Sequence, residues 1–236
     1  MPRNRLLLLG GAVLAALVVV AIVIVVAGRG SSSSSPPPAT TTTAGGGGTE
    51  AQSTFKGIPQ RGDTLGKASA PVTLTVFEDP QCPFCRQWNI DTVPTVVQNY
   101  VRSGRIKIVY RGIPIIGENS LVGLAAVYAA ALQNKLWSLS EALYERQGDE
   151  NSGWITTAVV KDAAREVGAN PTKLVADMKS AAVASQITAS ERQAKSLGID
   201  STPTFGIQHP LGTLQQLQVS SLDPSEFSSA LDQALQ

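Results

Sequence analysis

Cysteine and histidine are nearly absent from this chain. Its 236 residues include two cysteines and a single histidine, His209. A zinc site is normally built from thiolates and imidazoles, so a metal site here would have to depend on carboxylates. A framework of several disulfides is excluded, since one pair at most can form. The composition therefore disfavours a metalloprotein or a disulfide scaffold, and no metal or organic cofactor is expected.

An excess of charge of one sign is also lacking. Nineteen basic residues stand against eighteen acidic ones, and the formal net charge is +1. The two signs are interspersed, without long blocks of either. The sequence thus offers no polybasic patch to the phosphates of a nucleic acid, and no nucleic-acid partner is expected.

The two cysteines lie two positions apart, in the segment Cys82-Pro83-Phe84-Cys85. Residues 72–77 before them form an apolar run that is typical of a buried strand, and a helical pattern follows. The pair is thereby predicted to begin a helix, where free N–H groups and the helix dipole favour a thiolate. Pro83 suits the first helical position because it has no N–H to leave unpaired. Cys82 is the predicted nucleophile and Cys85 the resolving thiol.

Three simpler interpretations of this pair remain open: half of a metal site, an inert structural disulfide, and two buried free thiols. The metal site lacks further thiolate and imidazole ligands. A disulfide between residues so close in sequence closes a very small loop and restrains the unfolded chain little. Redox chemistry is the interpretation that the spacing and the position favour.

The N-terminal segment is predicted to anchor the chain in the cell membrane as a single-pass helix. Residues 6–27 are uncharged and, at about 1.5 Å per residue, would span a hydrocarbon core of ~30 Å. The positive-inside rule places residues 1–5, with two arginines, in the cytoplasm and the catalytic domain outside it. A cleaved signal peptide is the alternative, although its apolar part is normally about 7–15 residues long. Residues 28–53 consist of Ser, Pro, Thr and Gly runs and are predicted to be a disordered linker.

Residues 54–236 are predicted to fold as one α/β domain with a single sheet. A helix is expected from Cys82 to about Arg102, with a disruption at Pro94. Helical stripes then fill residues 118–198, which indicates an all-helical insertion, and Ser120 is its expected first cap. A further helix is expected after Asp223-Pro224. Strands are expected at residues 55–59, 72–77, 106–111, 204–207 and 214–219.

Two motifs far apart in the chain resemble the DsbA-like branch of the thioredoxin superfamily. One is the strand that leads into the Cys82–Cys85 motif, and the other is residues 198–205, which contain Thr202-Pro203. That family has a thioredoxin fold with an inserted helical subdomain, which corresponds to residues 118–198. The resemblance implies a protein thiol–disulfide oxidoreductase that oxidises exported proteins. It also implies reoxidation by a membrane redox partner of the DsbB or vitamin-K-epoxide-reductase type.

The resemblance also implies roles for individual residues. Cys82 matches the attacking cysteine and Cys85 the resolving one. Pro203 matches a proline that is cis in the family, with Thr202 offering backbone pairing to an extended substrate. Phe84 stands where many members carry a histidine that helps to hold the thiolate, so an oxidase and a reductase or isomerase both remain open. A non-catalytic peptide-binding module is a third hypothesis.

Acidic and basic residues also lie near the motif. Asp79 and Glu78 are the nearest carboxylates, and an acid in this region can shuttle the proton of the resolving cysteine in relatives. Asp79 is the acid singled out, either as that shuttle or as a turn cap, and its position before a proline favours the cap. Arg86 is a further candidate for supporting the thiolate. His209 lies in an expected turn and is interpreted as a surface residue.

Overall fold

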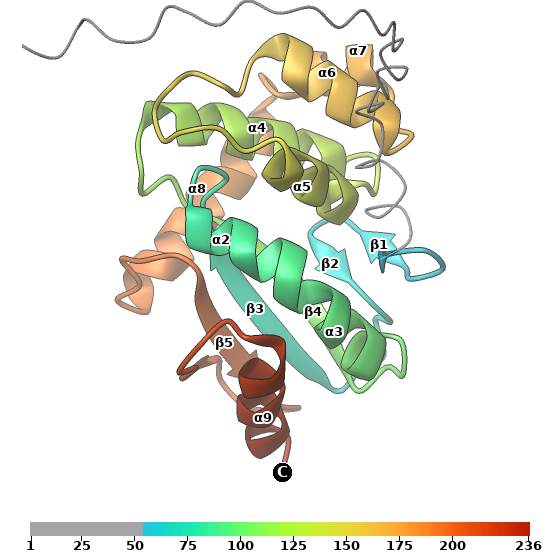
Figure 1. Ribbon diagram of the computed structural model, residues 1–236, viewed down its shortest axis with the longest axis vertical. Coiled ribbons are helices and arrows are strands. Elements are labelled where there is room, and N and C mark those ends of the chain that lie inside the picture. Colours follow the sequence, from blue (N-terminus) through green and yellow to red (C-terminus); the bar gives the residue numbers. More distant parts are fainter. Residues whose placement is uncertain (1–53) are drawn as a thin grey trace, which may run out of the picture. The chain divides into compact units, whose positions relative to one another are not determined.

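The computed structural model describes residues 54–236 of the chain (Figure 1). The predicted membrane anchor and linker, residues 6–27 and 28–53, lie outside the described residues. Within the described part of the chain, no helix has both the length and the apolar character that crossing a membrane requires. The described part corresponds to the predicted catalytic domain.

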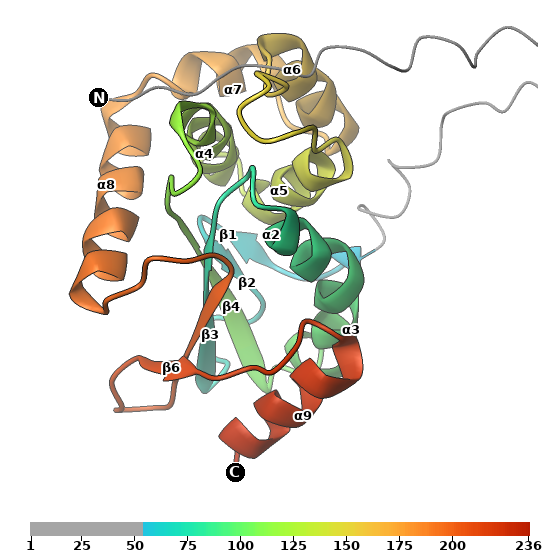
Figure 2. The ribbon, with the colours of Figure 1, turned by 60° about the vertical axis from the view of Figure 1, so that its left-hand side comes forward.

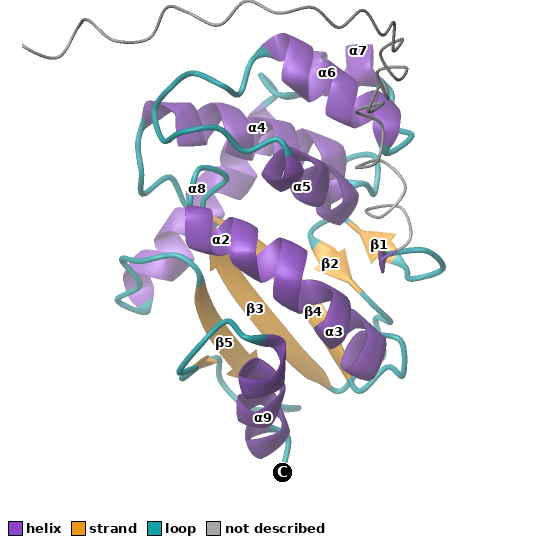
Figure 3. Cartoon of the chain, in the orientation of Figure 1, coloured by secondary structure: helices purple, strands orange, loops and turns teal. Residues whose placement is uncertain are grey.

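A six-stranded sheet forms the centre of this domain, with the strand order β1-β2-β4-β3-β5-β6 (Figure 3). The central strands β3 (Val72–Glu78) and β4 (Ile106–Gly112) run parallel to each other. β5 (Thr204–Gln208) pairs antiparallel with β3, and β6 (Gln215–Leu217) pairs antiparallel with β5. Every residue of β3 except Thr73 is buried, as expected for an apolar, β-branched strand covered on both faces.

The other edge of the sheet is a short hairpin of β1 (Gln60–Arg61) and β2 (Thr64–Leu65). The prediction of a strand at residues 55–59 is wrong, because strand pairing begins only with β1. Gly57 has a φ of 76° and turns the chain at this point. Pro59 has no N–H for a ladder bond, which also disfavours a strand there.

One helical run lies against β3 and β4, on the side facing the viewer in Figure 1. Its segments are α2 (Pro83–Gln87), η1 (Trp88–Thr92), α3 (Val93–Val96) and η2 (Val97–Val101). The segments η1 and η2 are π-helical and flank Pro94, which has no N–H for an α-helical bond. The Val93 N–H donates to the carbonyl of Trp88, five residues back. The wider π-helical turns therefore accommodate Pro94. The helical run covers nearly the whole of the predicted helix, from Cys82 to about Arg102.

The predicted insertion between the two halves of the sheet, residues 118–198 of the described chain, consists of five helices joined by loops and contains no strand. Its helices are α4 (Glu118–Ala131), α5 (Leu136–Glu145), α6 (Thr157–Glu166), α7 (Pro171–Asp177) and α8 (Ala181–Ser196). After β6 the chain ends in α9 (Pro224–Ala234). Figure 2 shows α8 on one side of the sheet and α2, α3 and α9 on the other. The predicted α/β fold with a helical insertion is thus confirmed.

Capping side chains fix where most of these helices begin. The side chains that accept a hydrogen bond from a backbone N–H in the first turn of α6, α7, α8 and α9 are Thr156, Asn170, Ser180 and Asp223. The prediction that Ser120 caps the first insertion helix is wrong, because α4 begins at Glu118. Ser120 is buried within α4, and its hydroxyl accepts a hydrogen bond from Gln81 Nε2 at 2.9 Å.

An aromatic cluster joins the helical run to the sheet and to α9. The ring centroid of Trp88 lies 4.8 Å from that of Phe205 in β5 and 4.6 Å from that of Phe227 in α9. The rings of Phe205 and Phe227 are 4.9 Å apart and nearly perpendicular, a favoured geometry. Since Trp88 follows α2 directly, this cluster fixes the position of the helix that carries both cysteines.

Candidate active site

Cys82 caps the helix with its own sulfur. It is the N-cap residue of α2, and its Sγ accepts a hydrogen bond from the Cys85 N–H at 3.4 Å. Hydrogen bonds from the Cys85 thiol and from the N–H groups of Cys85 and Phe84 lower the pKa of Cys82 to about 6, although burial opposes this shift. Pro83 occupies the first helical position, as predicted. The Cys82 thiol can also donate to the carbonyl of Thr202 at 3.2 Å.

Cys85 lies one turn further into the helix and is a different kind of thiol. Its side chain is 0% exposed, against 4% for Cys82. Burial raises the pKa of Cys85 well above its ordinary value, and the neighbouring Cys82 and Glu78 raise it further. Both cysteines are free thiols in this structure. Cys82 is therefore suited to nucleophilic attack, whereas Cys85 needs a partner to accept its proton.

Glu78 is the acid that faces these sulfurs. It is the last residue of β3 and is 0% exposed. Its carboxylate accepts hydrogen bonds from Trp88 Nε1 at 3.1 Å, Asn89 Nδ2 at 2.8 Å and the Tyr144 hydroxyl at 2.8 Å. Burial raises the pKa of Glu78 to about 8, although the three donors act in the opposite direction. A carboxyl group with such a pKa can exchange a proton near neutral pH.

Asn89 connects Glu78 to Cys85. Its Nδ2 donates one hydrogen to Glu78 Oε2 and the other, at 2.9 Å, to the Cys85 carbonyl. Electrostatic repulsion between Glu78 and Cys85 also raises the pKa of Cys85. Asn89 thus links the Glu78 carboxylate to the backbone of the residue that carries the resolving thiol.

The sequence analysis named Glu78 only as a nearby acid and did not single it out. The alternation of side chains along β3 was the signal that could have identified it. Leu74 and Val76 belong to the core cluster that contains Trp88, whereas Phe77 packs in a separate cluster with Ala194 of α8. Two residues beyond Val76, Glu78 faces the helix with the cysteines.

Asp79 has a different set of partners. Its Oδ1 accepts a hydrogen bond from the Gln81 N–H at 2.9 Å, and its Oδ2 accepts from the N–H groups of Ile115 and Ile116 at 2.8 and 2.9 Å. The carboxylate therefore joins the turn before α2 to the loop after β4. This geometry corresponds to the capping role considered for Asp79, and the position suited to a proton shuttle is occupied by Glu78.

Of the other residues that the sequence suggested near the site, some lie beside Cys82 and others do not. The Thr202–Pro203 peptide bond is cis, as the resemblance implies, and the Thr202 carbonyl lies beside Cys82. Phe84 is 62% exposed on the surface next to the nucleophile. Arg86 donates from Nε to the carbonyl of Tyr144 at 3.1 Å, so its described contact is with α5. His209 is exposed after β5 and has no described part in the site.

The helical insertion holds the loop before the cysteines through side-chain amides. Gln147 Nε2 donates to the carbonyls of Pro80 at 2.9 Å and of Cys82 at 3.1 Å. Gln81 Oε1 accepts from the Asn151 N–H at 2.7 Å. These contacts fix the active-site loop between the sheet and the insertion. They come from residues that are distant in the sequence, which explains why the sequence analysis missed them.

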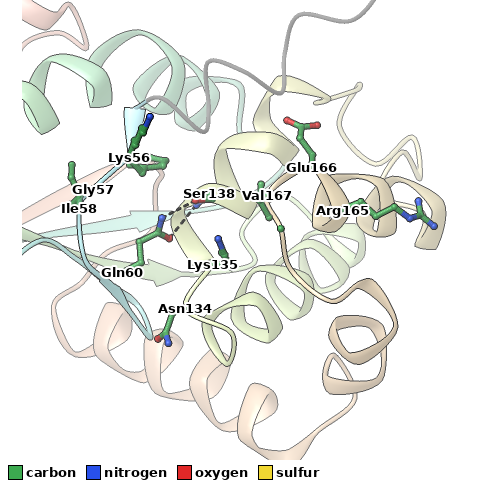
Figure 4. A pocket seen from close by; sticks show the side chains of 12 residues that line it. Lys56, Gly57, Ile58, Gln60, Asn134, Lys135, Ser138, Arg165, Glu166 and Val167 are labelled. Carbon is green, nitrogen blue, oxygen red and sulfur yellow. Dashed lines mark hydrogen bonds between the residues drawn. The ribbon is translucent and has the colours of Figure 1, made fainter.

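An open groove of about 870 Å³ lies elsewhere in the domain, between the segment before β1 and helices α5 and α6 (Figure 4). Polar side chains such as Gln60, Lys135 and Ser138 line it, and neither cysteine does. Within residues 54–236, no cluster of three or more His, Cys, Asp or Glu side chains could hold a metal ion.

Comparison with known proteins places this site in a family. The thioredoxin family profile matches residues 60–233. The chain therefore belongs to the thioredoxin family.

Individual relatives narrow the class further. The chain is 28% identical over 147 residues to the probable disulfide bond formation protein D of Bacillus cereus, covering 60% of this chain and 67% of the relative. It is 27% identical over 157 residues to the disulfide bond formation protein D of Bacillus subtilis, covering 65% and 69%.

Solved structures agree with this assignment. The oxidised BdbD of Bacillus subtilis has a TM-score of 0.63 at 24% identity, with 73% of this chain and 92% of that chain covered, which shows a shared fold. A thioredoxin-like oxidoreductase from Silicibacter pomeroyi has a TM-score of 0.57 at 29% identity, with 78% and 96% covered. The predicted enzyme class, a DsbA-like protein thiol–disulfide oxidoreductase, is confirmed.

Proposed function

We propose that this protein is an extracytoplasmic, membrane-tethered oxidase that introduces disulfides into exported proteins. The lowered pKa of Cys82, beside a buried Cys85 whose pKa is raised, is the observation that carries the proposal. A thiolate that the protein stabilises favours the reduced form of the pair, so the disulfide form is the stronger oxidant. The names of the curated relatives, disulfide bond formation proteins, support the same direction.

The proposed reaction moves two electrons from two substrate thiols to the enzyme disulfide. A substrate thiolate attacks Cys82 Sγ, the Cys82–Cys85 bond breaks, and Cys85 leaves as a thiolate. Glu78, protonated at neutral pH because its pKa is about 8, gives its proton to that thiolate. A second substrate thiolate then attacks the substrate sulfur of the mixed disulfide, and Cys82 leaves as the thiolate that the helix N-terminus stabilises.

In the proposed reoxidation, the reduced enzyme passes the two electrons on to a membrane redox partner of the DsbB or vitamin-K-epoxide-reductase type. Cys82 attacks the partner's disulfide, Glu78 takes the proton of Cys85, and Cys85 attacks Cys82 Sγ to restore the enzyme disulfide. Anchoring by residues 6–27, with residues 28–53 as a tether, would raise the effective concentration of the domain near such a partner.

The deciding experiment is the reduction potential of the Cys82–Cys85 pair in the detergent-solubilised full chain, equilibrated with glutathione buffers. We expect a value near that of DsbA, about −120 mV. A value near that of thioredoxin, about −270 mV, would contradict the oxidase and support a reductase. Phe84 is the specific feature that favours this second direction, because it cannot stabilise the thiolate as an imidazolium would.

A further inference from the structure

The hydroxyl of Tyr144 lies within hydrogen-bond distance of two acceptor atoms but has only one hydrogen to donate. Tyr144 lies near the C-terminal end of α5, in the helical insertion, and is 1% exposed. Its oxygen is 2.8 Å from Glu78 Oε2 and 3.2 Å from the carbonyl oxygen of Asp79. A phenol donates one hydrogen bond and can also accept one. The hydroxyl therefore has two alternative arrangements at this site.

We propose that Tyr144 is a positioning residue that keeps Glu78 hydrogen-bonded in both of its protonation states. When Glu78 is charged, the Tyr144 O–H donates to Oε2. When Oε2 carries a proton, Glu78 donates to the Tyr144 oxygen, and the phenolic hydrogen turns to the carbonyl of Asp79. Glu78 can then gain or lose a proton without leaving a buried donor or acceptor unpaired, which is costly. This inference depends on the proposed role of Glu78 as the proton partner of Cys85.

The other two partners of Glu78 act only as donors in the hydrogen bonds that the structure shows. Trp88 offers an indole N–H, which only donates. Asn89 offers its amide nitrogen, whose second hydrogen is already bonded to the Cys85 carbonyl. Among the described residues bonded to Glu78, Tyr144 alone presents an atom that can both donate and accept.

The electrostatic surroundings of Glu78 make this hydroxyl important. None of the described hydrogen bonds to its carboxylate comes from a lysine or an arginine. The titratable groups around it come from α2, β4, α5 and the turn after β3, and they are Cys82, Cys85, Tyr110, Tyr144 and Asp79. Arg86 reaches the backbone of Tyr144 and not the carboxylate. The charge on Glu78 is therefore stabilised by neutral donors, of which Tyr144 has the largest effect on its pKa.

The test is Tyr144→Phe in the full chain, with Tyr110→Phe as the matched control. Both tyrosines are almost completely buried, and both substitutions remove one hydroxyl without changing the ring. Among residues 54–236 the Tyr110 hydroxyl has no hydrogen-bond partner, although the charge of Glu78 contributes to raising its pKa. A difference between the two variants therefore reports the bond to Glu78 and not the general polarity of the site.

The measured step begins when the reduced enzyme is mixed with glutathione disulfide. Cys82 forms a mixed disulfide and one glutathione leaves. Cys85 then gives its proton to Glu78 and attacks Cys82 Sγ, so that the enzyme disulfide forms and the second glutathione leaves as a thiolate. The rate of this second step is followed against pH, because it depends on the charged form of Glu78.

For the unchanged chain we expect the rate to rise through a midpoint near pH 8. In Tyr144→Phe the midpoint should rise by about one pH unit, since a charge-assisted hydrogen bond is lost, and the rate at neutral pH should fall roughly three- to tenfold. Tyr110→Phe should keep the midpoint of the unchanged chain. An unshifted midpoint in Tyr144→Phe, or an equal shift in both variants, would overturn the inference.

Glu78→Gln separates a failure of this inference from a failure of the proposed proton transfer. We expect this variant to lose the midpoint near pH 8 altogether. If it keeps the profile of the unchanged chain, Glu78 is not the proton partner, and both proposals fail. If it loses the midpoint while Tyr144→Phe does not shift it, the role of Glu78 stands and that of Tyr144 does not.

Discussion

The two ends of the helical run that packs on β3 both contain buried side chains, but these side chains differ in chemical character. At the N-terminal end, Cys82, Cys85 and Glu78 form a polar, titratable cluster beneath α2. At the C-terminal end, Val97 and Val101 pack with other apolar side chains in the main core cluster. The first end depends on particular atoms at hydrogen-bond distance, and the second depends on shape and apolar area.

This difference teaches how one helix serves both reactivity and stability. Burial without full charge compensation gives Glu78 a pKa of about 8, and the hydrogen bonds at the helix start give Cys82 a pKa of about 6. Perturbed groups of this kind are typical of functional sites and seldom add stability. The apolar end stabilises the same helix by burying side chains. Changes at the two ends should therefore have separable effects.

The largest expected effect is that of Cys82→Ser. This variant cannot form the Cys82–Cys85 disulfide that accepts the two electrons, so oxidation of a model dithiol peptide should fall to the uncatalysed rate. The thermal unfolding midpoint should stay close to that of the reduced parent chain, since serine is similar in shape to cysteine and Cys82 packs in a small cluster apart from the main core. A large fall in this midpoint would contradict the separation of the two ends.

The next effect, on stability alone, is expected for Val97→Ala. Val97 is 1% exposed, and the cavity left by two lost methyl groups should reduce the free energy of unfolding by roughly 2 kcal/mol. Denaturant titration of the oxidised chain measures this loss, and the reduction potential of the cysteine pair should not change.

Val122→Ala is the matched control, because Val122 in α4 is 39% exposed and undergoes the same chemical change. Its effect on the free energy of unfolding should stay within about 0.5 kcal/mol. If Val97→Ala shifts the reduction potential as well, packing at the apolar end influences the thiols, and the separation between the two ends fails.

The same contrast explains what could be predicted from the sequence. The apolar end of the helical run and the insertion follow a local rule, side-chain periodicity, and their extents were predicted from it, although the predicted cap Ser120 lies inside α4. The cysteines were found because their spacing is a local signal. Tyr144, by contrast, is 66 residues from Glu78, and nothing in either local segment indicates that they meet. The alternation along β3 could have indicated the face on which Glu78 lies, but only the fold shows which partners surround its carboxylate.

The smallest expected effect is the change in the alkylation rate of Cys82 with pH. The pKa of Cys82 lies below its ordinary value, so the thiolate should persist above about pH 6 and be lost as the pH falls through that value. The rate of alkylation of the reduced chain should therefore fall about tenfold between pH 7 and pH 5, in proportion to the thiolate fraction. In Cys85→Ala the midpoint should rise, because the Cys85 thiol is the donor that lowers this pKa most. An ordinary cysteine titration in the unchanged chain would show that the helix N-terminus does not stabilise the thiolate. The polar end of the helix would then lose the property that distinguishes it from the apolar end.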